Sequence, residues 1–176
     1  MPNWCQNDLS VRGGSSELSR FEAHANGLRG PLDFNKFIPY PKKFTDMDEQ
    51  GALETCREKE PETVNMTSDE IKVYLKLQGK KLDDYNIHWR GFNNGGFEWC
   101  AVNWDTKWPA SNTTVRFSKT SLLYLFDTAW GPPSKVIIKM GEMFPKLKFH
   151  LKYKLEGNEG KGVLTIENGK VIKNKS

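Results

Sequence analysis

LKFHLKYKL, residues 147–155, is the segment in which apolar and polar side chains alternate most regularly. Every second residue from Leu147 is large and apolar, and the residues between them are three lysines and His150. Because successive side chains of a β-strand point to opposite faces, this period of two predicts a strand with one face in the core and the other in water. We expect His150 to lie on the wet face as a solvated side chain.

Strand and helix patterns surround this segment. Short apolar or alternating runs that end at Gly, Pro or Asn predict strands at residues 3–12, 32–38, 113–118, 121–127, 163–169 and 170–174. Apolar residues that recur every three or four positions predict helices at residues 15–26, 67–79, 97–104 and 134–145. We expect Trp4, Leu9 and Val11 to anchor the first strand in the core, and Val73 to face inward with Ile71, Tyr74 and Leu75.

This order of elements predicts an α+β fold, a ferredoxin-like antiparallel sheet with helices packed on one face. A chain of 176 residues is typical of a single domain, so we expect one domain over residues 1–176. Between about residues 42 and 84 the composition turns acidic and irregular. We interpret this part as a helical insertion that adds little to the core, with a short helix at residues 50–59.

Composition excludes several classes of protein. A hydrophobic share of 37% and an aromatic share of 12% are typical of a folded globular chain and not of a disordered one. No apolar run is long enough to span a membrane, and the first residues do not resemble a secretory signal. The three cysteines form no CxxC pair, which argues against disulfides and zinc. We therefore expect a cytoplasmic protein without metal, cofactor or membrane contact.

Charge is distributed unevenly along the chain. Residues 1–106 hold 13 Lys and Arg against 17 Asp and Glu, a net charge of −4, whereas residues 107–176 hold 13 against 5, a net charge of +8. Such a basic half is typical either of a solvated, lysine-rich sheet face or of a surface that attracts phosphates or nucleic acid. The excess consists mostly of lysine, which offers no bidentate fork for phosphate, and this favours the solvated face.

The run WCAVNWDTKW, residues 99–108, holds three of the six tryptophans. The helical spacing of Phe97, Cys100, Ala101 and Trp104 ends at Asp105, so we expect the helix to give way to a strand within the run. Polar residues alternate with the rings, and a strand-to-helix junction follows at residues 128–130. Indoles stack on bases and helix N-termini attract anions, so we predict a nucleotide or nucleic-acid site at this junction. Its expected residues are Asn103, Trp104, Asp105, Thr106, Lys107, Trp108, Thr128 and Trp130.

An alternative interpretation is that the tryptophans are core side chains, each stabilised by about 2–3 kcal/mol on burial. Two further classes stay open. An enzyme could use Asp105, Asp127, His88 or Glu98, but no spacing marks a triad, a dyad or a phosphate loop, and Cys100 is expected to be a buried apolar side chain. We therefore assign no catalytic residue. A binding protein could inhibit a host complex through the acidic insertion.

Four stretches together resemble a known family: MPNWCQNDLSV at residues 1–11, IPYP at 38–41, WCAVNWDTKW at 99–108 and LFDTAWGPPSKVI at 125–137. The chain is similar to phage- and plasmid-borne proteins that carry a YubB-type ferredoxin-like domain. The resemblance implies an α+β fold and a mobile-element origin in a bacterial host, and it carries no catalytic assignment. Asp105 stands where that family usually has glycine; if the position needs a positive φ, Asp is a tolerable but poorer substitute.

Overall fold

The computed structural model describes residues 3–158 and 160–175. The chain divides into two compact units, one formed by Met1–Pro39 with Glu98–Ser176 and the other by Tyr40–Phe97. The insertion expected at about residues 42–84 lies inside the second unit, which extends beyond it at both ends.

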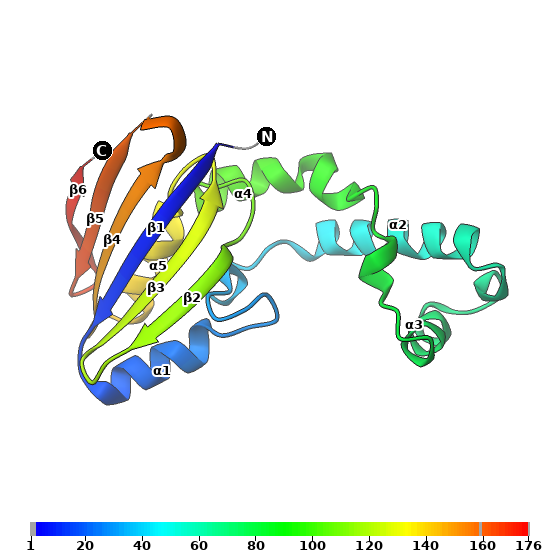
Figure 1. Cartoon of the computed structure of the whole chain (residues 1–176), viewed down its shortest axis with the longest axis horizontal. Coiled ribbons are helices and arrows are strands. Elements are labelled where there is room, and N and C mark those ends of the chain that lie inside the picture. Colours follow the sequence, from blue (N-terminus) through cyan, green and yellow to red (C-terminus); the bar gives the residue numbers. More distant parts are fainter. Residues whose placement is uncertain (1–2, 159, 176) are drawn as a thin grey trace. The chain divides into compact units, whose positions relative to one another are not determined.

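The first unit is built on a six-stranded, fully antiparallel sheet (Figure 1). The strand order is β2-β3-β1-β4-β5-β6. The strands are β1 (Trp4–Arg12), β2 (Ser111–Phe117), β3 (Ser121–Ala129), β4 (Lys148–Leu155), β5 (Lys161–Glu167) and β6 (Lys170–Lys175). The strand expected at residues 147–155 is thus confirmed, and with it the α+β class.

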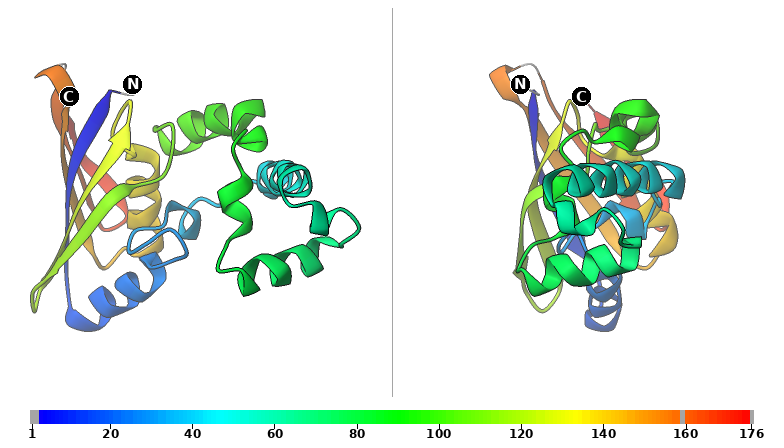
Figure 2. Two further views of the ribbon diagram at one scale, coloured as in Figure 1. Left: turned by 45° about the vertical axis from the view of Figure 1, so that its right-hand side comes forward. Right: turned by 90° about the vertical axis from the view of Figure 1, so that its right-hand side faces the viewer.

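Two helices pack on one face of this sheet (Figures 1 and 2), α1 (Ser15–Ala25) and α5 (Ser134–Met143). Phe21 of α1 is fully buried, with its ring centroid 6.0 Å from that of Tyr124 on β3 and 5.4 Å from that of Phe149 on β4. Val136, Ile137 and Met140 of α5 are also fully buried. The apolar residues of the alternating strands therefore meet the apolar stripes of both helices, as the sequence predicts.

The strand expected at residues 32–38 is wrong. Only a 3₁₀ turn, η1 (Phe34–Lys36), forms there, and the Asp33 side chain accepts a hydrogen bond from the Asn35 N–H that starts it. Phe34 and Phe37 are both buried because they stand three residues apart on this turn. A turn that places aromatic residues on one side gives nearly the same pattern as a strand, so the sequence did not separate the two.

The second unit has a small core of its own. Its helices are α2 (Lys42–Lys59) and α3 (Ser68–Leu77), joined by the 3₁₀ turn η2 (Pro61–Thr63) and followed by the turns η3 (Leu82–Tyr85) and η4 (Phe92–Gly96). The buried side chains that form this core are Ala52, Cys56, Ile71, Leu75 and Tyr85.

Two expectations for the second unit are corrected. The helix expected at residues 50–59 begins at Lys42, directly after Pro41, whose φ of −62° suits a helix start. Val73 is 60% exposed, because α3 buries only the side that carries Ile71 and Leu75. The predicted start of α3 is confirmed by a capping box, in which Thr67 and Glu70 each accept a hydrogen bond from the other's backbone N–H.

Close packing between α5 and β5 gives a test of the fold. A Cβ on Gly141 would lie 2.4 Å from Cγ2 of Ile166. Alanine normally stabilises a helix interior by about 1 kcal/mol relative to glycine, but overpacking costs about 1–3 kcal/mol. We expect Gly141→Ala to lower the free energy of unfolding in urea by about 1–2 kcal/mol. Combining it with Ile166→Ala should cost less than the sum of the two single changes; a stabilised Gly141→Ala variant would contradict this packing.

Candidate functional site

The opposite face of the sheet carries a second, polar set of side chains, which we call the open face. No described helix of the first unit packs on it. On the central strand β1, Gln6, Asp8 and Arg12 are exposed, whereas their neighbours Cys5, Asn7, Leu9 and Val11 are buried. The open-face residues of β1 pair with those of β4 as Gln6 with Lys154, Asp8 with Lys152, Ser10 with His150 and Arg12 with Lys148.

Positive charge gathers on the open face. The pKa of His150 is lowered, first by burial and then by the charges of neighbouring cations, which are Lys152, Lys173, Arg12 and Lys148. His150 therefore stays uncharged at neutral pH, and its Nδ1 forms a 2.8 Å hydrogen bond with the Thr165 hydroxyl on β5. The expectation that His150 lies on the polar face is confirmed, although it is partly buried there.

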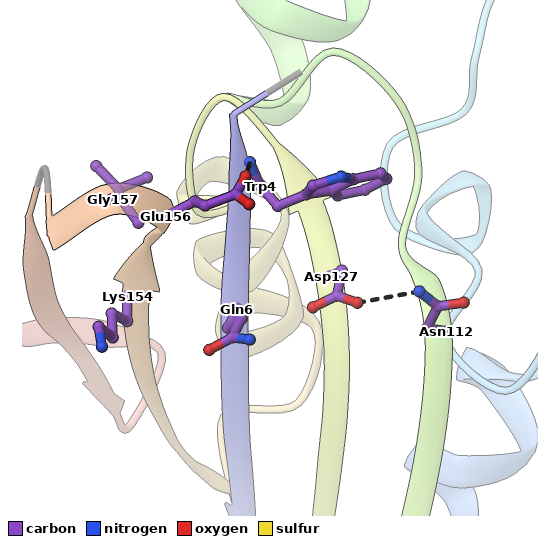
Figure 3. Close-up of a pocket in the computed structure, with 8 residues that line it drawn as sticks. Trp4, Gln6, Asn112, Asp127, Lys154, Glu156 and Gly157 are labelled. Carbon is purple, nitrogen blue, oxygen red and sulfur yellow. Dashed lines mark hydrogen bonds between the residues drawn. The ribbon is translucent and has the colours of Figure 1, made fainter. Parts of the chain in front are cut away.

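Two adjacent hollows mark the open face. One, of about 640 Å³, is shown in Figure 3 and is lined by Trp4, Gln6, Asn112, Asp127, Lys154, Leu155, Glu156 and Gly157. The other, of about 530 Å³, is lined mainly by β1, β4 and β5 and includes four lysines: Lys152, Lys154, Lys161 and Lys175. Gln6 and Lys154 belong to both, so an extended ligand could occupy the two hollows together.

An aromatic cluster stands at the end of the sheet beside the first hollow. The rings of Trp4 and Trp108 meet edge to face with centroids 5.7 Å apart. The Lys107 ammonium lies 5.6 Å from the Trp108 ring centroid and 4.8 Å from that of Trp130, which is 47% exposed. Both distances are typical of cation–π contacts. Because Trp4 also lines the hollow, the aromatic cluster and the open face are continuous.

Three residues of the site expected from the sequence are buried and cannot touch a ligand in this structure. Trp104 is a core side chain whose Nε1 donates to the Ile38 carbonyl at 2.9 Å. Thr106 donates its hydroxyl to the Ala129 carbonyl at 2.7 Å and accepts from the Ala129 N–H at 3.1 Å. Thr128 accepts a 2.8 Å hydrogen bond from Asn7 and is fully buried. Burial thus divides the tryptophan run, with Trp104 inside and Trp108 partly exposed.

Asn103 and Asp105 serve the local backbone. The Asn103 amide donates to the carbonyl of Trp99, one helical turn back in α4 (Phe97–Trp104), at 2.9 Å. Asp105 ends that helix with a φ of +62°, so the position does need a positive φ. One Asp105 oxygen accepts from the Lys135 N–H in the first turn of α5 at 3.1 Å, and the other lies 3.0 Å from the Lys135 ammonium. The strand expected within the run begins only at Ser111.

The sequence missed most of the open-face site. Trp4 was expected in the core with Leu9 and Val11, but it stands an odd number of residues from both and therefore lies on the opposite face, with Gln6. Assigning alternate residues of β1 to the same face would have placed Trp4 with Gln6. Asn112 and Asp127 come together only through the pairing of β2 with β3, which the sequence does not specify.

The cysteines and the possible metal ligands of the described residues give little support to nucleophilic or metal chemistry. Burial raises the pKa of the Cys5 thiol to about 11 and that of the Cys100 thiol to about 12, so neither is a thiolate near neutral pH. Cys100 is a buried side chain, as expected. Within residues 3–158 and 160–175, no group of three or more His, Cys, Asp or Glu is placed to hold a metal ion. In the same ranges, no helix has the length and apolar character needed to cross a bilayer.

The antiparallel sheet with helices on one face defines an α+β protein, and a family model assigns a ferredoxin-like domain to its C-terminal part. Residues 103–176 match a family model described as the ferredoxin-like domain in Api92-like protein. The whole chain is similar to the crystal structure of the protein api92 from Yersinia pseudotuberculosis, with a TM-score of 0.57, 12% sequence identity, and coverage of 100% of this chain and 98% of that one. At this identity the likeness shows the fold alone. No curated protein matches the chain.

The role of Asp105 can be tested by substitution. We expect Asp105→Ala to lower the free energy of unfolding by about 1–2 kcal/mol, because it removes the acceptor at the start of α5 and strains a left-handed residue. Asp105→Asn keeps an acceptor and tolerates a positive φ, so it should cost less than half as much. Equal losses in the two variants, measured by urea denaturation, would show that the side chain does not cap α5.

Proposed function

We propose that the protein binds single-stranded nucleic acid along the open face, with the aromatic cluster as a stacking platform at one end. The observation that carries the proposal is the continuity of the two features. The tryptophan rings at the end of the sheet, of which Trp130 is exposed and Trp4 and Trp108 are partly buried, adjoin two hollows through Trp4. Lysines from β4, β5 and β6 line these hollows. Aromatic rings next to a row of cations suit single-stranded nucleic acid, which presents bases and phosphates along its length.

The lysines supply the electrostatic part of this interaction. Each cation that neutralises a phosphate releases condensed counterions, which favours binding at low salt without reading the sequence. Lysine is a flexible point charge and binds a mobile phosphate backbone without demanding one geometry. The carboxylates on the open face are fewer than its lysines. One of them, Glu167, is already paired with Lys148 at 3.0 Å. The second hollow therefore keeps a positive balance, with four lysines against Asp8, whereas the first holds two carboxylates, Asp127 and Glu156, and one lysine, Lys154.

The tryptophans supply the apolar part. Stacking of a base on an aromatic side chain is worth about 1–3 kcal/mol and tolerates any base. Trp130 is held at a φ of +76°, and its backbone N–H donates to the Asn3 carbonyl at 2.8 Å. This fixed backbone keeps the half-exposed ring beside Lys107, whose ammonium also lies over the Trp108 ring. A ring positioned in advance loses little conformational entropy when a base stacks on it.

The biological setting extends the same proposal. We infer from the sequence resemblance that the protein is an accessory factor of a phage, prophage or plasmid, active in the cytoplasm of the bacterial host. Single-stranded nucleic acid is a common intermediate when such elements replicate or transfer. Binding it could counter a host defence. The open face, rather than a catalytic residue, would be the functional part.

A second candidate function is protein binding through the second unit. Val73 and Leu77 lie four residues apart on α3 and are 60% and 81% exposed. Two apolar side chains on one helical face are typical anchors for a partner. This supports inhibition of a host protein complex as an alternative, in which the sheet would serve only as a scaffold. No spacing supports a third candidate, a nucleotide-processing enzyme.

The lysines of the open face provide the test. The double variant Lys152→Gln/Lys154→Gln should weaken binding of a fluorescent oligo(dT) or oligo(rU) by on the order of tenfold near 0.1 M salt. It should also reduce the slope of log K against log salt by about 1.4, as expected for two lost phosphate contacts. Fluorescence anisotropy over a salt series measures both, and the two oligonucleotides show whether DNA or RNA binds better.

A matched control removes two charges from the helix-covered side of the first unit. Lys36→Gln/Lys139→Gln lowers the net charge equally, so it should leave affinity within about twofold. Equal losses in the two double variants would mean that only total charge matters. Absence of binding by the unmodified protein at low salt would end the proposal.

A further inference from the structure

The hollow at Trp4 contains two acidic side chains, Asp127 and Glu156, on a sheet face where cations outnumber carboxylates. Asp127 lies on β3 beside β1, and its Oδ2 accepts a 3.1 Å hydrogen bond from the Asn112 amide on β2. A carboxylate on a surface that binds phosphates weakens backbone binding by repulsion. The hydrogen bond with the exposed Asn112 is only a weak structural reason for a carboxylate at position 127. Hydrogen bonds between exposed groups contribute little to stability.

The neighbours of Asp127 offer the groups that a nucleobase would contact. In Figure 3 the Trp4 indole reaches from β1 across β3 toward Asn112, and Asp127 and Gln6 lie below it on the same side of the sheet. Glu156 lines the same hollow, where its Oε2 accepts the Trp4 backbone N–H at 3.2 Å. The hollow thus offers one aromatic ring for stacking, the carboxylate of Asp127, and two amides, Gln6 and Asn112, each with donors and an acceptor; Glu156 and Lys154 also line it.

We propose that this hollow recognises a guanine base in the bound strand, with Asp127 as the residue that determines specificity. This inference rests on the proposed function. The Watson–Crick edge of guanine carries two adjacent donors, N1–H and the N2 amine, followed by the O6 acceptor. The two oxygens of Asp127 match the two donors, and an amide N–H of Gln6 or Asn112 matches O6. A carboxylate accepts about four hydrogen bonds, so the bond from Asn112 leaves room for both.

The other bases fit this set of groups less well. Adenine and cytosine each place a ring-nitrogen acceptor beside their amine, and thymine and uracil place carbonyl oxygens on both sides of their N3–H. Each of these acceptors would face the carboxylate and lose its hydrogen bond to water without replacement. The lysine-lined hollow next to Asp127 would hold the phosphates that flank the guanine. A guanine within a strand should therefore bind more tightly than free guanosine monophosphate.

The test compares oligonucleotides of about nine residues, within the usual footprint of such domains. One is oligo(dT); the others carry a single central guanine, adenine, cytosine or hypoxanthine, the base of inosine, which lacks the N2 amine. By anisotropy, the unmodified protein should bind the guanine strand about 5- to 100-fold more tightly than oligo(dT), the discrimination expected of a bidentate contact. The hypoxanthine strand should lose most of that preference, and this arm requires no change to the protein. Guanosine monophosphate should compete only weakly.

Protein variants complete the test. Asp127→Asn keeps the size of the side chain but loses one acceptor and the charge, so the guanine preference should fall to about twofold or less while affinity for oligo(dT) stays the same or rises. Glu142→Gln, on α5, removes one negative charge outside the open face and should keep the preference. Binding of all strands with equal affinity, or a preference that survives Asp127→Asn, would refute the guanine site and leave the proposed function standing. No affinity for any strand would refute the proposed function itself.

Discussion

β1 is paired on both sides, with β3 and with β4, and its alternation determines which residues enter the core and which remain in water. A shift of one residue in this strand would move its apolar side chains into solvent and its charged ones into the core. Asn7 adds a polar constraint in the same place. It is 1% exposed, and its amide donates to the Cys5 carbonyl and to the Thr128 hydroxyl, each at 2.8 Å. A slipped register would leave that amide buried without partners, which costs about 1–3 kcal/mol.

The open face follows from this constraint. Once Cys5, Asn7, Leu9 and Val11 face the helices, Gln6, Asp8 and Arg12 must face the other way, and antiparallel pairing aligns the lysines of β4 beside them. The cations of distant segments thus meet on one surface because the strands bring them there. The uneven charge along the sequence matches this arrangement, since β4, β5 and β6 all lie in the basic half.

The sequence predicted those parts of the fold that depend on local periodicity. Strand β4, the helical spacing that ends at Trp104 and the start of α3 next to Thr67 all depend on residues close in the chain. The sequence did not predict the parts of the fold whose conformation depends on tertiary contacts. Phe34 and Phe37 occupy a turn because both rings reach the core from there, and α2 extends back to Lys42 although its first turns are polar. The open face escaped prediction for the same reason, since Asn112 and Asp127 meet only through strand pairing.

The tryptophan run combines two roles that the sequence could not separate. Trp104 fills the core between Phe34 and Trp99, Asp105 turns the chain and caps α5, and Trp108 reaches the surface beside Trp4. The buried half of the run therefore positions the partly exposed half, as the proposed binding platform requires. NMR mapping of backbone amides during titration with a guanine-containing oligonucleotide tests this account most directly. We expect the largest shifts on β1, β4 and β5 and at residues 107, 108, 112, 127 and 130; shifts confined to α1, α5 or the second unit would contradict it.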